Sequence, residues 1–166
     1  MKKIILLLIL FSLQKVSSQK IKKDYPLSKI IEETSGLEII DDLFITHNDS
    51  GGEASLYYLS KKGKILNKRK IKSATNRDWE DITKDKKYIY IGDFGNNYNN
   101  RTDLKIFKVP IDPNSKEKNE IISFKYPEQK SFKVNKKTIY DGEGLISIDN
   151  SLIVFTKNRD KKITEL

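Results

Sequence analysis

The chain has 166 residues, of which 33% are charged and 37% hydrophobic, and its formal net charge is +9. This composition is typical of one globular domain and excludes a disordered chain. The sequence contains no cysteine, which excludes disulfides, thiolate metal sites and a lipid-modified cysteine anchor.

Residues 1–18 have the pattern of a secretory signal peptide. Lys2 and Lys3 precede a short apolar run that ends at Leu13, and a cleavage signal of mostly small residues follows at 16–18. The apolar run is shorter than the roughly 20 residues that a membrane-spanning helix needs. We therefore expect a protein that is secreted or periplasmic and has no transmembrane anchor.

Residues 19–32 form a basic lead-in, which we expect to be a tether or the closing strand of a circular fold. The lysines and arginines that follow are scattered over turns and strand edges, where charge blocks edge-to-edge association. They form no continuous stripe. We therefore expect solvated edges and no nucleic-acid partner, with an anionic surface or polymer as the alternative.

Three strand-rich units follow the lead-in, at about 33–72, 78–134 and 141–166. In each unit an apolar run ends in a polar loop, and a second apolar run comes soon after it, which predicts antiparallel strands. Repeated four-stranded meanders are typical of the blades of a β-propeller. Because a propeller has roughly four to eight blades, these about two and a half blades predict an all-β N-terminal fragment whose remainder is missing. A self-contained antiparallel sandwich or an open sheet is the alternative.

Acidic side chains lie at the starts of the expected inner strands and in the loops that leave the next strands. In a propeller these positions gather around the mouth of a central channel. Calcium binds roughly six to eight oxygen ligands, whereas softer metals favour Cys and His, which this chain almost lacks. The candidate metal ligands are Asp49, Asp78, Glu80, Asp81, Asp93, Asp141 and Glu143.

The same residue types are also ordinary turn formers, because Asp, Asn and Gly cap backbone N–H groups and tolerate a left-handed backbone. A purely structural role for the acidic loops therefore stays open. Weaker candidates, for binding a small-molecule or anionic ligand, lie in the same loops: Asn48, Asn96, Asn97, Arg101 and Lys157.

Other chemistries find less support. His47 is the only histidine and Ser50 lies in no G-x-S-x-G elbow, so a Ser-His-Asp hydrolase would need parts from outside this chain. Glu80 and Glu143 are a candidate carboxylate pair for glycoside hydrolysis, with metal binding as an equal alternative. Residue Trp79 is expected to fill the core between two units.

Several motifs together resemble a known group of proteins. The strings at 46–52 (THNDSGG), 78–82 (DWEDI) and 92–97 (GDFGNN) are similar to those of a family of secreted bacterial β-propeller proteins, mostly uncharacterised. That family is related in architecture to phytase-like and NHL-like propellers. The string at 141–144 is similar to acidic loops that hold calcium in the phytase-like proteins, so the resemblance implies Ca²⁺ and phosphate as ligands.

The leading expectation is an exported β-propeller that binds Ca²⁺ or another ligand through acidic loops at its channel mouth. A calcium-dependent phosphoester or ester hydrolase is one alternative, in which the metal neutralises substrate charge and activates water. A structural or adhesive module is the other. The sequence leaves open whether the protein is an enzyme.

Overall fold

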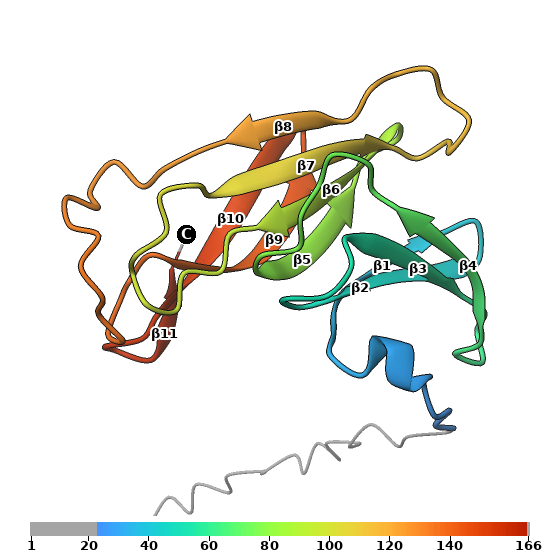
Figure 1. Cartoon of the computed structure of the whole chain (residues 1–166), viewed down its shortest axis with the longest axis horizontal. Helices are drawn as coiled ribbons and strands as arrows, with labels where there is room; N and C mark the ends of the chain where they lie inside the picture. Colours follow the sequence, from blue (N-terminus) through green and yellow to red (C-terminus); the bar gives the residue numbers. More distant parts are fainter. Residues whose placement is uncertain (1–22, 166) are drawn as a thin grey trace, which may run out of the picture.

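The computed structural model of the chain describes residues 23–165 (Figure 1). The predicted signal peptide and the first residues of the lead-in lie outside this range. Between residues 23 and 165 the chain forms one short 3-10 helix, η1 (Lys29–Ile31), and eleven β-strands, which confirms the all-β prediction. This part of the chain contains no helix that is long and apolar enough to cross a membrane.

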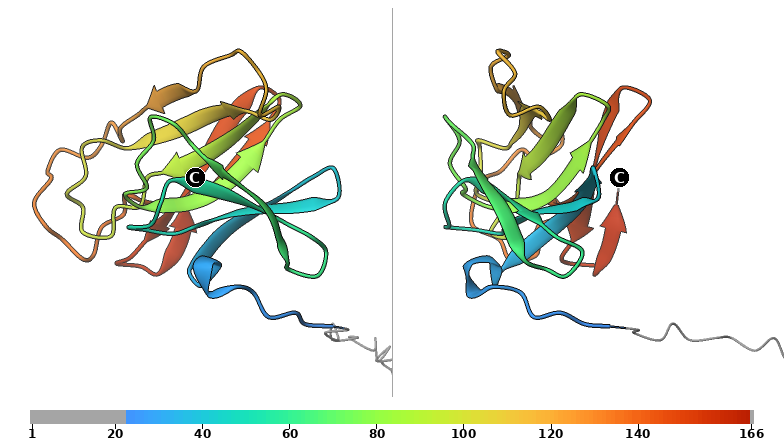
Figure 2. Two further views of the ribbon diagram at one scale, coloured as in Figure 1. Left: turned by 45° about the vertical axis from the view of Figure 1, so that its right-hand side comes forward. Right: turned by 90° about the vertical axis from the view of Figure 1, so that its right-hand side faces the viewer.

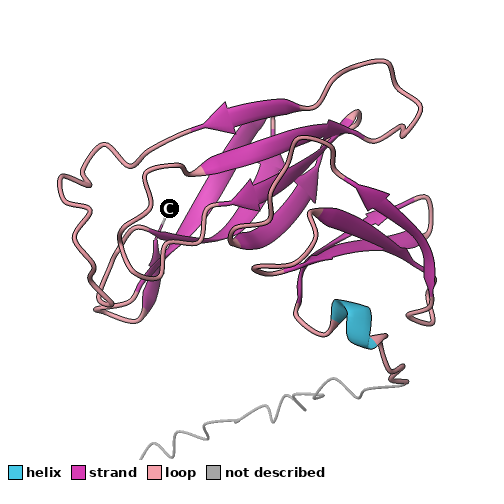
Figure 3. Cartoon of the chain, viewed as in Figure 1, coloured by secondary structure: helices cyan, strands magenta, loops and turns pink. Residues whose placement is uncertain are grey.

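The strands form three antiparallel sheets, each built from strands that follow one another in the chain (Figure 3). Sheet 1 contains β1 (Thr34–Ile40), β2 (Leu43–Asn48), β3 (Ser55–Leu59) and β4 (Ile65–Lys70). Sheet 2 contains β5 (Trp79–Lys84), β6 (Tyr88–Asp93), β7 (Lys105–Pro110) and β8 (Glu120–Ser123). Sheet 3 contains β9 (Asp141–Ile148), β10 (Ser151–Asn158) and β11 (Ile163–Glu165).

Two-residue turns close the first hairpins of sheets 1 and 3. Asp41 and Asp42 join β1 to β2, and Asp149 and Asn150 join β9 to β10. All four residues have positive φ, between 47° and 66°. A type I′ turn requires this backbone, and Asp and Asn adopt it more readily than most residues. These turns therefore explain why the chain reverses at the two positions without a glycine.

Sheet 2 lies between the other two sheets and buries both of its faces (Figure 2). Along β6, Ile89 and Ile91 pack toward sheet 1, whereas Tyr88 and Tyr90 pack toward sheet 3. Successive side chains of a strand point to opposite faces, so a strand buried on both sides reads as a continuous apolar run. Trp79 is fully buried in the core shared by sheets 1 and 2, which confirms its expected core role.

The lead-in packs against the outer face of sheet 1. Ile31 of η1 is fully buried, and it contacts Tyr57 and Leu59 of β3. Residues 23–28 contain no strand, and η1 attaches the lead-in to sheet 1, as expected of a tether. The closing-strand alternative stays a prediction, because the three described sheets form no closed ring.

The first strands of the three sheets lie side by side, with β5 between β1 and β9. The Ser35 hydroxyl of β1 donates a hydrogen bond to a backbone carbonyl of β5. The backbone N–H of Leu145 donates to the Asp81 carboxylate at 2.7 Å, and two residues further the N–H of Ser147 donates to the Thr83 hydroxyl at 3.2 Å. Since these contacts advance in the same direction along β5 and β9, polar residues at the starts of both strands meet at one end of the molecule.

Candidate functional site

Three of the predicted metal ligands come together between sheets 1 and 2. Asp49 follows β2 directly, Asp78 precedes β5, and Glu80 is the second residue of β5. Each offers a carboxylate oxygen, and these oxygens lie within 4.8 Å of one another. We call this group, Asp49, Asp78 and Glu80, the acidic centre.

Backbone and amide hydrogen bonds fix the two segments that carry the acidic centre. The N–H of Trp79 donates to the Asp49 carbonyl at 3.2 Å, and the N–H of Asp49 donates to the Glu33 carbonyl at 2.9 Å. The side chain of Asn76 donates to the Asn48 carbonyl at 2.9 Å. The loop after β2 is thus held against the start of β5, which brings carboxylates from two sheets together.

The acidic centre is half-buried, and its charges are poorly compensated. Burial raises the pKa of Glu80 to about 9, and the carboxylates of Glu143, Asp78 and Asp49 add to this effect. The pKa values of Asp78 and Asp49 are also raised, first by burial and then by neighbouring carboxylates. The Oδ1 atom of Asp49 is buried and has no hydrogen-bond partner within residues 23–165. An arrangement of this kind favours the uptake of a proton or a cation, because either one offsets the repulsion between like charges.

Two further predicted ligands, Asp141 and Glu143 at the start of β9, lie beside the acidic centre but have basic partners. The guanidinium of Arg159 donates to the Asp141 carboxylate, and also to Glu143 at 3.1 Å. Lys157, a predicted ligand-binding residue, forms an ion pair with Glu143 at 3.1 Å. Burial, followed by a hydrogen bond to Asp141, raises the pKa of Glu143. These two carboxylates therefore form a separate, largely neutralised cluster at the edge of the acidic centre.

Asp81 and Asp93 lie outside the acidic centre and support the fold. The Asp81 carboxylate accepts hydrogen bonds from the N–H groups of Leu145 and Ile82, at 2.7 and 2.8 Å. Asp93 is fully buried and pairs with Arg101 at 2.9 Å. Their carboxylates are used to join strands and to hold the loop after β6.

The remaining ligand-binding candidates also make internal contacts. Asn48 donates to the Ile30 carbonyl at 2.7 Å and so ties the lead-in to sheet 1. The backbone N–H of Asn96 donates to the Asp141 carboxylate at 2.7 Å, and Asn97 accepts from Arg159 at 3.1 Å. Arg101 is only 4% exposed, and it donates to the carbonyl of Gly95 in its own loop and to that of Asp93 at the end of β6.

A cavity of about 210 Å³ opens beside Asp78. Ser50, Asn97 and Arg101 line it together with Asp78. The cavity gives a small ligand a route to one carboxylate of the acidic centre.

The only histidine is a core residue. His47 is fully buried, its ring meets Trp79 edge-on at 5.6 Å, and its Nδ1 donates to the Asn48 carbonyl at 2.9 Å. Burial lowers its pKa to about 4, so the ring is neutral at physiological pH.

Two residues at this site, Arg159 and Gly95, were not among the predicted site residues. Arg159 follows β10 directly, at the position that Asp49 has after β2. A comparison of these repeated loops was therefore the signal that could have indicated Arg159 as a site residue. Gly95 lies against the carboxylates: a Cβ atom there would be 2.1 Å from Oε1 of Glu80 and 2.3 Å from Oδ2 of Asp78. No local pattern indicates which glycine has this role, because the close approach joins different loops.

The acidic centre fits a hard divalent cation. Its donors are all carboxylate oxygens, which Ca²⁺ and Mg²⁺ prefer, and the buried Oδ1 atom of Asp49 lacks a protein partner among the described residues. Three carboxylates supply part of a calcium coordination sphere, and water or a ligand in the adjoining cavity can supply the rest.

No protein-family model matches the chain, and neither the curated proteins nor the solved structures gave a match. The resemblance to secreted bacterial propellers therefore stays a prediction.

Proposed function

We propose that this chain forms consecutive blades of a β-propeller and binds Ca²⁺ at the acidic centre, where the inner strands begin. Three successive antiparallel meanders, stacked with β1, β5 and β9 side by side, support the propeller. The cation would lie at the channel end of the inner strands, and a small ligand would reach it through the cavity beside Asp78.

One observation carries the calcium proposal. Carboxylate oxygens from two different sheets lie within 4.8 Å of one another, and one oxygen of the group is buried without a partner in the described chain. Bringing like charges together during folding costs free energy, and a bound cation reverses the sign of that interaction. Asp49, Asp78 and Glu80 would hold the ion, which when bound supplies positive charge for an oxygen-bearing ligand.

Isothermal titration of the purified chain with CaCl₂ tests the proposal. We expect saturable binding, together with a rise in melting temperature that EDTA removes, because a ligand that binds only the folded state stabilises it. Asp78→Asn should weaken binding at least about tenfold, since one charged donor is lost. The matched control is Asp160→Asn, whose carboxylate is 54% exposed and pairs with Lys137 on the surface.

Two results would reject calcium binding at this site. One is the absence of heat and of any thermal shift with CaCl₂. The other is an equal affinity of Asp78→Asn and Asp160→Asn, which would move any bound calcium away from the acidic centre.

A further inference from the structure

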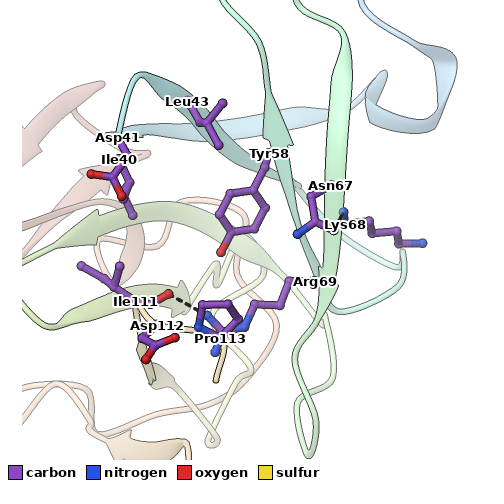
Figure 4. Close-up of a pocket in the computed structure, with 10 residues that line it drawn as sticks. All are labelled: Ile40, Asp41, Leu43, Tyr58, Asn67, Lys68, Arg69, Ile111, Asp112 and Pro113. Atoms are coloured by element: carbon purple, nitrogen blue, oxygen red, sulfur yellow. Dashed lines mark hydrogen bonds between the residues drawn. The ribbon is translucent and has the colours of Figure 1, made fainter. Parts of the chain in front are cut away.

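A second cleft, of about 570 Å³, opens between sheets 1 and 2 (Figure 4). It lies at the opposite end of these sheets from the acidic centre. Ile40 at the end of β1 and Ile111 after β7 line it, whereas the acidic centre lies at the start of β5. Its volume falls in the range of roughly 300 to 1,000 Å³ that is typical of small-molecule sites.

Apolar side chains from both sheets form the walls of the cleft. Ile40 and Leu43 come from the first hairpin of sheet 1, and Ile111 and Pro113 come from the connection between β7 and β8. The ring of Tyr58 stands between these walls, with its hydroxyl directed into the cleft (Figure 4). A ligand therefore meets apolar surface on two sides.

Polar groups surround these walls. The amide of Asn67 lies beside Tyr58, and the carboxylates of Asp41 and Asp112 lie on the opposite side (Figure 4). No hydrogen bond joins the Tyr58 hydroxyl to the other residues drawn around the cleft, so it can donate to or accept from a ligand (Figure 4). Lys68 points away from the cleft and pairs with Glu53.

The cleft is held in shape before any ligand binds. Nη1 of Arg69 donates to the carbonyl of Pro110 at 2.7 Å and to that of Ile111 at 3.3 Å, which ties β4 to the end of β7. Asp41 belongs to the tight turn with positive φ that joins β1 to β2. Preorganisation of this kind lowers the entropic cost of binding.

We propose that this cleft binds a neutral sugar ring. A sugar has C–H faces that pack on apolar and aromatic walls, and hydroxyls that both donate and accept hydrogen bonds. The cleft supplies acceptors in Asp41 and Asp112, a donor in the Asn67 amide, and a group of either kind in Tyr58. Two carboxylates and two cationic residues line the cleft, but Lys68 already pairs with Glu53 and Nη1 of Arg69 already donates to two carbonyls. The lining therefore disfavours an anionic ligand.

Saturation-transfer NMR on the purified chain tests this site, with maltose, cellobiose and N,N′-diacetylchitobiose as neutral probes and glucose 6-phosphate as the anionic probe. Co-sedimentation with insoluble cellulose and chitin shows whether the bound sugar ring belongs to a polysaccharide or to a free oligosaccharide. We expect at least one neutral probe or polymer to bind. EDTA should not change this binding, because no residue of the acidic centre lines the cleft.

Tyr58→Phe should weaken this binding about five- to tenfold, because it removes one hydrogen-bonding group and keeps the ring. The matched control is Tyr88→Phe, since the Tyr88 hydroxyl bonds Glu117 outside the cleft. The proposal is overturned if no neutral probe or polymer binds, if only glucose 6-phosphate binds, or if Tyr58→Phe binds as tightly as the Tyr88→Phe control. None of these outcomes bears on calcium binding, which is tested separately at the other end of the sheets.

Discussion

Gly95 lies against Glu80 so closely that a Cβ atom at residue 95 would be 2.1 Å from the Glu80 Oε1 atom. The loop after β6 thus forms one wall of the acidic centre, although none of its side chains belongs to that centre. The absence of a side chain at this position is therefore a requirement of the site.

We predict that Gly95→Ala displaces the carboxylates of Glu80 and Asp78 and weakens calcium binding at least about tenfold. Gly52→Ala is the control, because the nearest atoms to a Cβ at residue 52 are 3.9 Å away, an ordinary contact distance. Calorimetric titration of both variants measures the effect. Equal affinities would show that the ion does not lie against this wall.

The raised pKa of Glu80 predicts a pH-dependent stability. The folded state holds a proton with a pKa of about 9, whereas the unfolded state releases it near the ordinary value of 4.5. The folded chain therefore binds more protons in this window, and the free energy of unfolding falls as the pH rises from 4.5 towards about 9. Calcium should reduce the loss, since the cation stabilises the ionised carboxylate.

Glu80→Gln should flatten this pH dependence and abolish its response to calcium. Urea unfolding across the same pH window, with and without CaCl₂, measures both effects. A variant that loses stability with pH as steeply as the original chain would assign the dependence to other groups.

Asp141 is fully buried and depends on Arg159, whose side chain is 28% exposed. Arg159→Met would leave this carboxylate without its cationic partner, and breaking such a pair costs roughly 3 to 5 kcal/mol. Arg77→Met provides the comparison, because Arg77 pairs with Asp103 on the surface and an exposed pair contributes about 1 kcal/mol or less. Chemical denaturation of the two variants separates the cases, and similar losses would contradict the assignment.

His47 predicts a pH dependence of stability that is opposite in sign to that of Glu80, and it acts at acid pH. Burial lowers its pKa from 6.5 to about 4, so the unfolded chain binds a proton that the folded chain excludes. Stability should therefore fall as the pH drops from 6.5 towards 4, and His47→Gln should weaken that dependence. Thermal melts at a series of acid pH values test this, and an unchanged slope in the variant would exclude His47 as its source.

The sequence predicted the strands well because strand signals are local. Alternating apolar residues and turn formers such as Asp149 and Asn150 act over a few positions, and the structure has hairpins where they occur. The sequence left the lead-in open between a tether and a closing strand, because the burial of Ile31 against sheet 1 is a tertiary contact that no local pattern indicates.

The acidic residues were harder to sort because their roles depend on distant partners. The Asp81 carboxylate accepts a hydrogen bond from the N–H of Leu145, which is 64 residues away in the sequence. The side chain of Asn97 accepts one from Arg159, which is 62 residues away. Residue type gave the set of candidate oxygen donors. Only the packing of the sheets separates the three poorly compensated carboxylates of the acidic centre from those that hold the fold together.

The most direct test uses the single tryptophan of the chain, since Trp79 lies between Asp78 and Glu80 in the sequence. Tb³⁺, which replaces Ca²⁺ at oxygen-donor sites, should bind the acidic centre and emit when Trp79 is excited. We predict sensitised terbium emission that CaCl₂ displaces and that Asp78→Asn removes, while Asp160→Asn retains it. Absence of this emission, or emission of equal strength in both variants, would contradict a cation site at the acidic centre.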